Sequence, residues 1–214
     1  MLRLLWHAAR RVARKPSTPR QFPTNGFEII GSSCPLEEEG WEWYKPEEFY
    51  PVRLGEVFKS QYQVVGKLGY GAYGTAWLCR DLLYFPPCNS NTSVAKLTCV
   101  LRNHEHVTLK IGTPEALEAE LRTLRYLRTV KTGHPGSLLI RRMLGEFEVS
   151  NGGVLFQCIV HPPLAISIKA FRRMFPDFAL PTDLLKQVLK HLLLALDFLH
   201  TEAGVIHAGK SNRS

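Results

Sequence analysis

The chain has 214 residues, of which 45% are hydrophobic, so it can fold as one packed domain with part of a second. Its formal net charge is +8, but six positive charges precede Glu28, where no acidic residue occurs, so residues 28–214 carry only +2. The low charge of residues 28–214 argues against a nucleic-acid-binding body, and no apolar run is long enough for a membrane span. Five cysteines, odd in number and without a C-x-x-C pair, indicate a reduced intracellular protein.

Residues 1–48 are predicted to form a basic, mostly disordered extension. Residues 1–14 are rich in arginine, free of acidic residues and able to form an amphipathic helix, and a proline-rich stretch follows them. Such a segment is typical of a mitochondrial presequence and also of a disordered basic leader, and both interpretations stay open. Three aromatic residues, Trp41, Trp43 and Tyr44, are expected to dock onto the folded domain.

Three glycines at G-x-G-x-x-G spacing lie between two predicted strands, 62–67 and 75–79. They are Gly69, Gly71 and Gly74, and a turn of this kind exposes backbone N–H groups to phosphates because no Cβ holds the ligand away. A dinucleotide-binding fingerprint would continue directly into a helix, whereas the apolar and aromatic content of 75–79 favours a strand. The context therefore indicates the strand–loop–strand that covers the nucleotide in protein kinases.

Two segments compete for the third strand, 93–100 with Lys96 and 106–111 with Lys110. A helix is expected to follow, with Thr113 as its N-cap and proline at its first position. Its apolar stripe recurs at steps of three and four residues. The stripe consists of Leu117, Leu121, Leu124, Leu127 and Val130.

A β-hairpin is expected next, with strands at 144–149 and 154–160 around a turn at Gly152 and Gly153. The later pattern is helical, at 166–175 and 182–201. Residues 192–196 of the second helix are all apolar, so the helix is hydrophobic on every side there, which predicts burial on several faces. The fold class is therefore α+β, with an antiparallel sheet and one helix followed by the first helices of an incomplete helical lobe.

Several motifs follow one another in the order found in protein kinases. They are the stretch from Tyr50 to Leu82 with the glycine triplet, the strand ending in lysine, the segment 159–164, and Gly204-Val205-Ile206-His207. From about Glu37 to His207 the chain resembles the SR-protein kinase (SRPK-like) family of Ser/Thr protein kinases. This resemblance implies a kinase N-lobe at 49–160, then a hinge and an incomplete C-lobe at 161–214.

The resemblance also implies ATP, with magnesium, as the cofactor. The glycine triplet would cover the phosphates, while Leu68 and Ala76 would frame the adenine. Ala76 departs from the valine usual in the family, which removes a little apolar contact. The segment 159–164 would be the hinge whose backbone reads the edge of the adenine.

The phosphate-pairing lysine is expected at Lys110, because the four residues ending there match V-A-I-K with full spacing. Lys96 stays as the alternative, since it lies at the more usual distance from the glycines. Its glutamate partner is expected at Glu120, which falls on the apolar face of the helix. Glu118 lies four residues before Arg122 and suits a solvent-side ion pair.

The residues after His207 depart from the family pattern. Gly209 stands where kinases have the catalytic aspartate, and neither the metal-binding asparagine nor an Asp-Phe-Gly motif is recognised. Since phosphoryl transfer depends on the metal ions that these groups hold, we expect the chain as given to phosphorylate nothing. His104 and His106 lack further ligands and predict no metal site.

Three functions therefore stay open: an SRPK-like Ser/Thr kinase represented by an incomplete chain, a nucleotide-binding pseudokinase that acts through partners, and a non-functional fragment. The resemblance implies ATP as a partner and, in a full-length relative, a protein substrate of the Ser/Arg-rich type. No nucleic acid partner is expected. The cytoplasm or the nucleus is the location implied, and the arginine-rich N-terminus leaves the mitochondrion open.

Overall fold

A computed structural model describes residues 17–28, 35–42, 44–83, 106–114 and 116–206 of the chain. Several predictions lie outside these residues. They are the presequence-like helix, docking by Trp43, the lysine alternative at Lys96, His104 of the two histidines, and the segment from His207 onward that contains Gly209.

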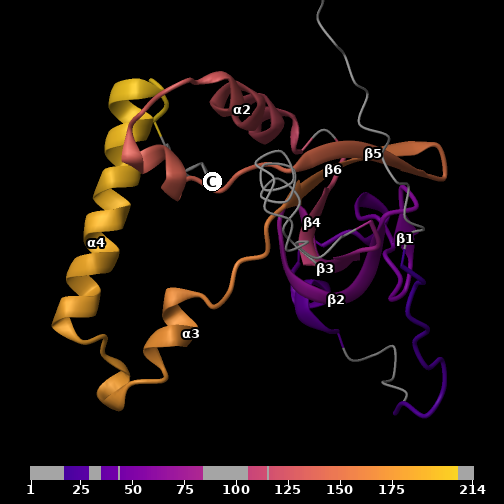
Figure 1. Ribbon diagram of the computed structural model, residues 1–214. Helices are drawn as coiled ribbons and strands as arrows, with labels where there is room; N and C mark the ends of the chain where they lie inside the picture. Colours follow the sequence, from indigo (N-terminus) through magenta and orange to yellow (C-terminus); the bar gives the residue numbers. More distant parts are fainter. Residues whose placement is uncertain (1–16, 29–34, 43, 84–105, 115, 207–214) are drawn as a thin grey trace, which may run out of the picture.

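A curled antiparallel sheet of six strands forms the larger body of the molecule (Figure 1). Its spatial order is β1-β2-β3-β4-β6-β5. The strands are β1 (Val57–Phe58), β2 (Tyr62–Gly71), β3 (Gly74–Asp81), β4 (His106–Gly112), β5 (Gly145–Asn151) and β6 (Val154–His161). Both predicted hairpins are confirmed, and Gly152 and Gly153 supply the positive φ angles, +57° and +83°, that a tight turn between β5 and β6 requires.

The helices are α2 (Glu118–Thr129), α3 (Ile168–Arg172) and α4 (Thr182–Asp197), the last continuing as one π-helical turn, η5 (Phe198–Glu202). Short 3-10 turns lie at η1 (Glu37–Gly40), η2 (Pro46–Glu48), η3 (Pro135–Leu139) and η4 (Pro176–Phe178). The helix predicted over 166–175 is shorter in the structure, where α3 covers only Ile168–Arg172. It begins after Ser167, whose hydroxyl caps it by accepting from the Ala170 N–H at 3.1 Å.

The prediction of Thr113 as an N-cap is wrong. Helix α2 begins at Glu118, and its N-cap residue Leu117 makes no side-chain cap. The Thr113 carbonyl instead accepts from the Ala116 N–H at 3.1 Å in a separate turn. The reason is tight packing, because a Cβ on Gly112 would lie 2.3 Å from Leu117 Cγ, so the chain turns sharply to bury this leucine.

Two apolar clusters lie on opposite faces of the sheet. The larger consists of Phe58, Val64, Cys79, Val107, Leu109, Ile111, Phe156, Cys158 and Val160. The smaller consists of Leu117, Leu121, Met143 and Ile159, with Leu124 packed against it, so the predicted stripe of α2 does face the sheet. Successive strand residues alternate between these faces, which places Lys110 on the face covered by α2.

Residues 17–20 of the predicted disordered extension are hydrogen-bonded to the sheet. The Ser17 N–H donates to the Leu82 carbonyl at 2.8 Å. The Gln63 side chain is buried, accepting from the Arg20 N–H at 2.8 Å and donating to the Arg20 carbonyl at 2.7 Å. The structure thus differs from the expectation here, because a buried amide finds its hydrogen-bond partners in the extension.

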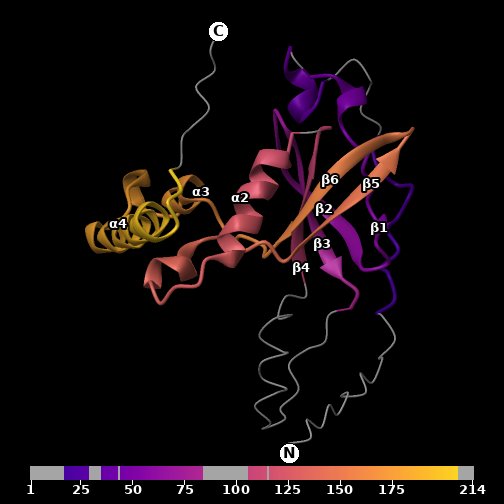
Figure 2. The same ribbon diagram turned by 90° about the horizontal axis from the view of Figure 1, so that it is seen from above.

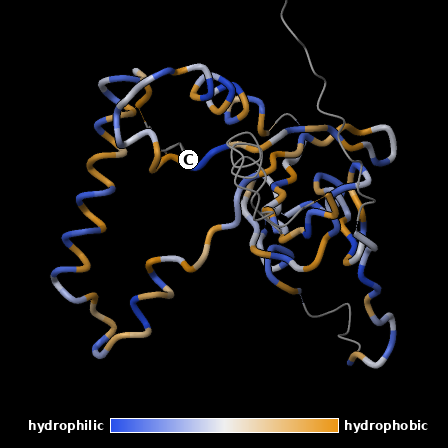
Figure 3. The backbone as a smooth tube through the Cα atoms, in the orientation of Figure 1, coloured by the Kyte–Doolittle hydropathy of each residue, from blue (hydrophilic) through white to orange (hydrophobic). Residues whose placement is uncertain are grey.

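Helix α4 lies apart from the sheet, with α2 between them (Figures 1 and 2). Turn η3 packs on α4 so closely that a Cβ on Gly136 would lie 2.1 Å from the Leu194 carbonyl oxygen. Hydrophobic residues recur along α4 (Figure 3), yet Leu192 and Leu193 are 52% and 64% exposed, so the described residues do not provide the burial predicted on several faces. None of the described helices combines the length and apolar character needed to cross a membrane.

Candidate functional site

The glycine triplet lies in the hairpin between β2 and β3, where Gly69 pairs with Ala76 and Gly71 pairs with Gly74. We call residues 69–76 the glycine hairpin. A hollow of about 360 Å³ is lined by this hairpin and by Lys110 of β4. The structure thereby brings together Gly69, Gly71, Gly74, Ala76 and Lys110, five residues that the sequence assigned to one nucleotide site. Leu68, which the sequence assigned to the adenine, directly precedes Gly69 in the chain but does not line the hollow, and it is 51% exposed.

The three glycines have different structural roles. Gly74 has φ +146°, and a Cβ there would lie 2.2 Å from the Ile111 carbonyl oxygen, so close packing against β4 requires glycine. Gly69 and Gly71 meet no such constraint, because an added Cβ would find nothing within 4 Å. Since the fold does not require glycine at these two positions, their bare backbone is available for a ligand to approach.

Lys110 is held at the hollow by an ion pair. It is paired on one side with Ala76 and on the other with Ile159, in the middle of the sheet. Its Nζ donates to Glu120 Oε2 at 2.5 Å, with the two side chains 33% and 38% exposed. This contact fixes an ammonium group beside the glycine hairpin while leaving part of it accessible.

The other glutamate of α2 points elsewhere. Glu118 lies 3.5 Å from Arg122, and the two side chains are 66% and 75% exposed. This is the solvent-side pair that the four-residue spacing indicated. The structure therefore separates the two candidate glutamates, with Glu120 on the lysine and Glu118 in solvent.

The segment expected to form the hinge, 159–164, begins in the last residues of β6 and continues beyond its end at His161. His161 is buried, and its Nδ1 lies 3.0 Å from the Arg142 carbonyl oxygen. Burial lowers the pKa of His161, because the charged imidazolium would lose its hydration. Arg141 donates from Nη2 to the Pro162 carbonyl at 3.0 Å, which ties the next residue of this segment to the loop between η3 and β5.

Sequence reasoning missed two contacts, one of the glycine hairpin and one of the strand residue just before it. The Thr113 N–H donates to the Tyr73 carbonyl at 3.2 Å, joining the hairpin tip to the turn before α2. Lys67 of β2 binds carboxylates from the N-terminal extension. The run of glutamates in that extension is evident in the sequence, but no sequence pattern indicates that Lys67 binds it.

The arrangement supplies positive charge and backbone donors but little else. Within the described ranges, no cluster of three or more His, Cys, Asp or Glu side chains could hold a metal ion. Both described thiols, Cys79 and Cys158, are buried, and burial raises the pKa of each to about 12. The site is therefore suited to binding an anion such as a phosphate chain, through Lys110 and the glycine hairpin.

Several known proteins are similar to this chain. A serine/threonine protein kinase of Aspergillus fumigatus is 41% identical over 208 residues, 96% of this chain and 48% of the relative. The serine/threonine-protein kinase SRPK of Physarum polycephalum is 31% identical, covering 80% of this chain and 37% of the relative. SRSF protein kinase 3 of Mus musculus is 27% identical, covering 90% and 31%. The chain thus spans about half the length of the first relative and less of the others.

The structural comparison agrees on the fold. A solved kinase domain superposes with a TM-score of 0.51 at 14% identity, covering 73% of this chain and 40% of that one. The predicted fold class is therefore confirmed, with a curled antiparallel sheet and few helices as in a kinase N-lobe with part of a C-lobe. No protein-family model matches the chain.

Proposed function

We propose that this chain, which is similar to a Ser/Thr protein kinase over 96% of its length and to the kinase SRPK over 80%, binds ATP in the hollow under the glycine hairpin. The observation that carries the proposal is the ion pair of Lys110 with Glu120, on the same face of the sheet as the register partners Ala76 and Gly69. A lysine fixed in this way presents its ammonium to phosphates in the arrangement that kinases use.

The residues at the hollow divide the binding task. The bare backbone of Gly69 and Gly71 would approach the phosphates, and Lys110 would neutralise part of their charge. Ala76 and Leu68 would contact the adenine, whose edge would meet the backbone after β6. Lys96, outside the described residues, is the competing candidate for the phosphate-pairing lysine.

Magnesium accompanies ATP in kinases and neutralises the charge that develops on the transferred group. The family holds it through an asparagine and an Asp-Phe-Gly aspartate, and no described residue stands at either position. ATP binding by this chain is therefore proposed to rest on Lys110 and on the glycine hairpin, with magnesium bound chiefly through the phosphates themselves.

For the whole protein we propose Ser/Thr phosphorylation of Ser/Arg-rich proteins, in the cytoplasm or nucleus and without nucleic acid as a partner. The 214 residues alone are proposed to bind nucleotide without transferring phosphate, because Gly209 offers no carboxylate to the substrate hydroxyl. A nucleotide-binding pseudokinase is the second candidate, favoured by the combination of an intact Lys110–Glu120 pair with this glycine. The division into an extension, an N-lobe at 49–160 and a hinge with helices from 161 belongs to the same proposal.

Isothermal titration of the 214-residue chain with ATP tests the binding. A hydrogen bond to a charged group contributes about 1.5–3 kcal/mol, so Lys110→Met is expected to weaken ATP binding by about 10-fold to 100-fold. Lys186→Met is the matched control, because the only ion pair of Lys186 among the described residues is with Asp183, and both side chains are exposed on α4. Absence of binding heat at millimolar ATP, or equal affinity of the wild type and Lys110→Met, would contradict the proposal.

Phosphate transfer is tested separately with radiolabelled ATP, magnesium and a Ser/Arg-repeat peptide. The 214 residues are expected to leave the peptide unlabelled. Labelling that persists in Lys110→Met would point to a contaminating kinase, whereas labelling that is lost in this variant would refute the assignment of Gly209 to the aspartate position.

A further inference from the structure

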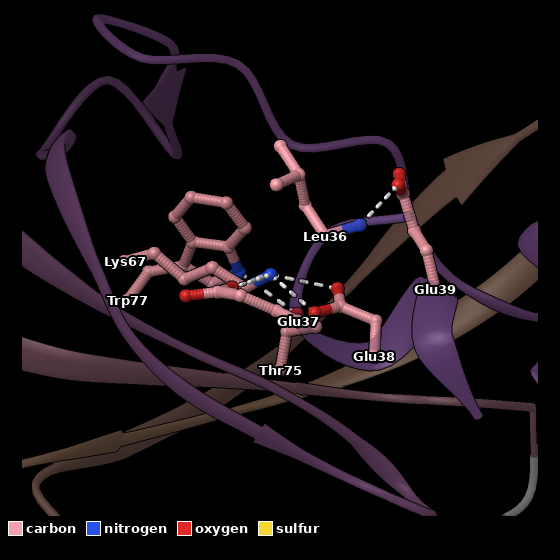
Figure 4. Close-up of polar contacts among 7 residues, drawn as sticks. All are labelled: Leu36, Glu37, Glu38, Glu39, Lys67, Thr75 and Trp77. Atoms are coloured by element: carbon pink, nitrogen blue, oxygen red, sulfur yellow. Dashed lines mark hydrogen bonds and ion pairs between the residues drawn. The ribbon is translucent and has the colours of Figure 1, made fainter. Parts of the chain in front are cut away.

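The acidic turn η1 (Glu37–Gly40) contacts the sheet beside the glycine hairpin (Figure 4). Lys67 Nζ lies 2.6 Å from Glu37 Oε2 and 2.6 Å from Glu38 Oε2, so two carboxylates share one ammonium. The side chain of Glu38 is only 9% exposed, against 52% for Glu37 and 24% for Lys67. Removing Lys67 would therefore leave a buried carboxylate without its counter-ion.

The backbone of this turn adopts a conformation that it would not choose alone. Glu37 has φ +51°, in the left-handed region that residues other than glycine rarely occupy. Such a conformation persists only where surrounding contacts hold it. Burial alone would lower the pKa of Lys67, but its hydrogen bonds to Glu37 and Glu38 raise it, so the ion pair stays charged.

Aromatic contacts extend from the same turn to the glycine hairpin. The Trp41 ring packs edge-on against Tyr70, with 5.1 Å between ring centroids. Lys67 Nζ lies 5.4 Å from the Tyr70 ring centroid and 5.8 Å from that of Trp77. Trp77 Nε1 in turn donates to Thr75 Oγ1 at 2.8 Å. These contacts end on Tyr70 and Thr75, two residues that pair with each other and line the hollow.

The hairpin is attached to the sheet at an irregular point. The register between β2 and β3 shifts between Lys67 and Gly69, so a regular ladder stops where the glycine hairpin begins. Lys67 pairs with Trp77, whereas Gly69 pairs with Ala76, the residue before Trp77. Ala76 also pairs with Lys110, so Gly69, Ala76 and Lys110 share one face of the sheet. Because neighbouring strand residues point to opposite faces, the acidic turn contacts the hairpin from the face opposite to the proposed nucleotide.

We propose that Glu37, Glu38 and Trp41 form a clamp that positions the glycine hairpin over the nucleotide. The clamp acts through the side chains of Lys67 and Tyr70, and its own three residues, Glu37, Glu38 and Trp41, position the hairpin without lining the hollow. Its effect on affinity rests on the proposed ATP site. If the hairpin of the unclamped protein is in the binding position only about one-tenth of the time, the apparent ATP affinity falls about tenfold.

The test uses the 214-residue chain, with amide hydrogen exchange read over residues 69–76 well below the unfolding temperature. Glu37→Gln with Glu38→Gln removes both charges at constant size. Glu47→Gln with Glu48→Gln is the matched control, because within the described ranges these two glutamates form only the exposed ion pair Lys45–Glu48. Lys67→Arg keeps the charge, whereas Lys67→Met removes it. ATP affinity is measured by titration on the same samples.

We expect exchange at 69–76 to rise about tenfold in the Glu37/Glu38 variant and in Lys67→Met, with about tenfold weaker ATP binding. The control and Lys67→Arg should remain near the wild type. Unchanged exchange at 69–76, or unchanged ATP affinity while the wild type does bind ATP, overturns the clamp. A wild type that binds no ATP overturns the proposed function instead, and the exchange rates still decide whether the clamp exists.

Discussion

Alanine substitutions should separate the glycine that the fold requires from the glycines kept free for the ligand. In Gly74→Ala the new Cβ would lie 2.2 Å from the Ile111 carbonyl oxygen and 2.8 Å from Gly112 Cα, so backbone must move. Overpacking costs about 1–3 kcal/mol and an unfavourable φ costs about 1–3 kcal/mol, so we expect a loss of about 3 kcal/mol in the free energy of unfolding. For a chain of this size that lowers Tm by about 6–12 °C.

Gly69→Ala combined with Gly71→Ala should behave in the opposite way. Neither added Cβ finds an atom within 4 Å, and an unstrained Gly→Ala change stabilises a protein by about 0.4–1 kcal/mol. The two changes together should therefore raise Tm by about 2–8 °C rather than lower it. The new methyl of residue 69 projects toward the face of Lys110, because Gly69 pairs with Ala76. It should therefore displace the ligand, and ATP binding should weaken about tenfold.

Differential scanning calorimetry and ATP titration of the two variants check this reasoning. The predicted result is a loss of Tm in Gly74→Ala alone and a loss of affinity without loss of Tm in the double variant. A double variant that binds ATP as the wild type does would refute the view that Gly69 and Gly71 face the ligand. A Gly74→Ala variant of wild-type Tm would refute the packing argument.

Two further predictions concern other parts of the fold. Gly136→Ala should lower the free energy of unfolding by about 1–3 kcal/mol, because its Cβ would lie 2.1 Å from the Leu194 carbonyl oxygen. Gly133→Ala is the control, since its Cβ would meet nothing within 4 Å. Thermal unfolding compares the two variants, and equal Tm values would contradict the docking of η3 on α4. The lowered pKa of buried His161 means that the unfolded chain binds the proton more readily, so stability is retained above about pH 6.5 and lost as the pH falls from there through the lowered pKa. Urea unfolding between pH 7 and pH 5 should show a smaller loss in His161→Asn, and an equal loss would contradict this assignment.

The sequence predicted the two hairpins because strand patterns and glycine turns are local signals, whereas it left two segments open for the strand that became β4. The glycine hairpin and the hairpin around Gly152 and Gly153 both carry such signals, and the stripe of α2 ended correctly on the sheet. The start of α2 was not predictable in the same way. Thr113 and its following proline form a good local cap, yet burial of Leu117 against Gly112 moved the helix start to Glu118.

The candidate site was predictable where the position of a residue on a helix or strand determines the face to which its side chain points. Glu120 on the apolar face and Glu118 on the solvent face could be told apart by spacing, and the structure places them so. The partner of Lys67 could not be found, because Glu37 and Glu38 lie about thirty residues away in sequence, in a segment whose composition indicates disorder. Only tertiary contact shows that this charged run lies against the sheet.

The central claim is that Lys110, among the lysines of this chain, faces the phosphates of bound ATP. An acyl-phosphate derivative of ATP tests it directly, because a lysine amine beside the terminal phosphate attacks the acyl carbon, forms an amide and releases ATP. Peptide mapping then identifies the modified lysine. We predict acylation at Lys110 that excess ATP suppresses. Acylation at Lys96 in its place, or labelling that ATP does not reduce, would contradict the account.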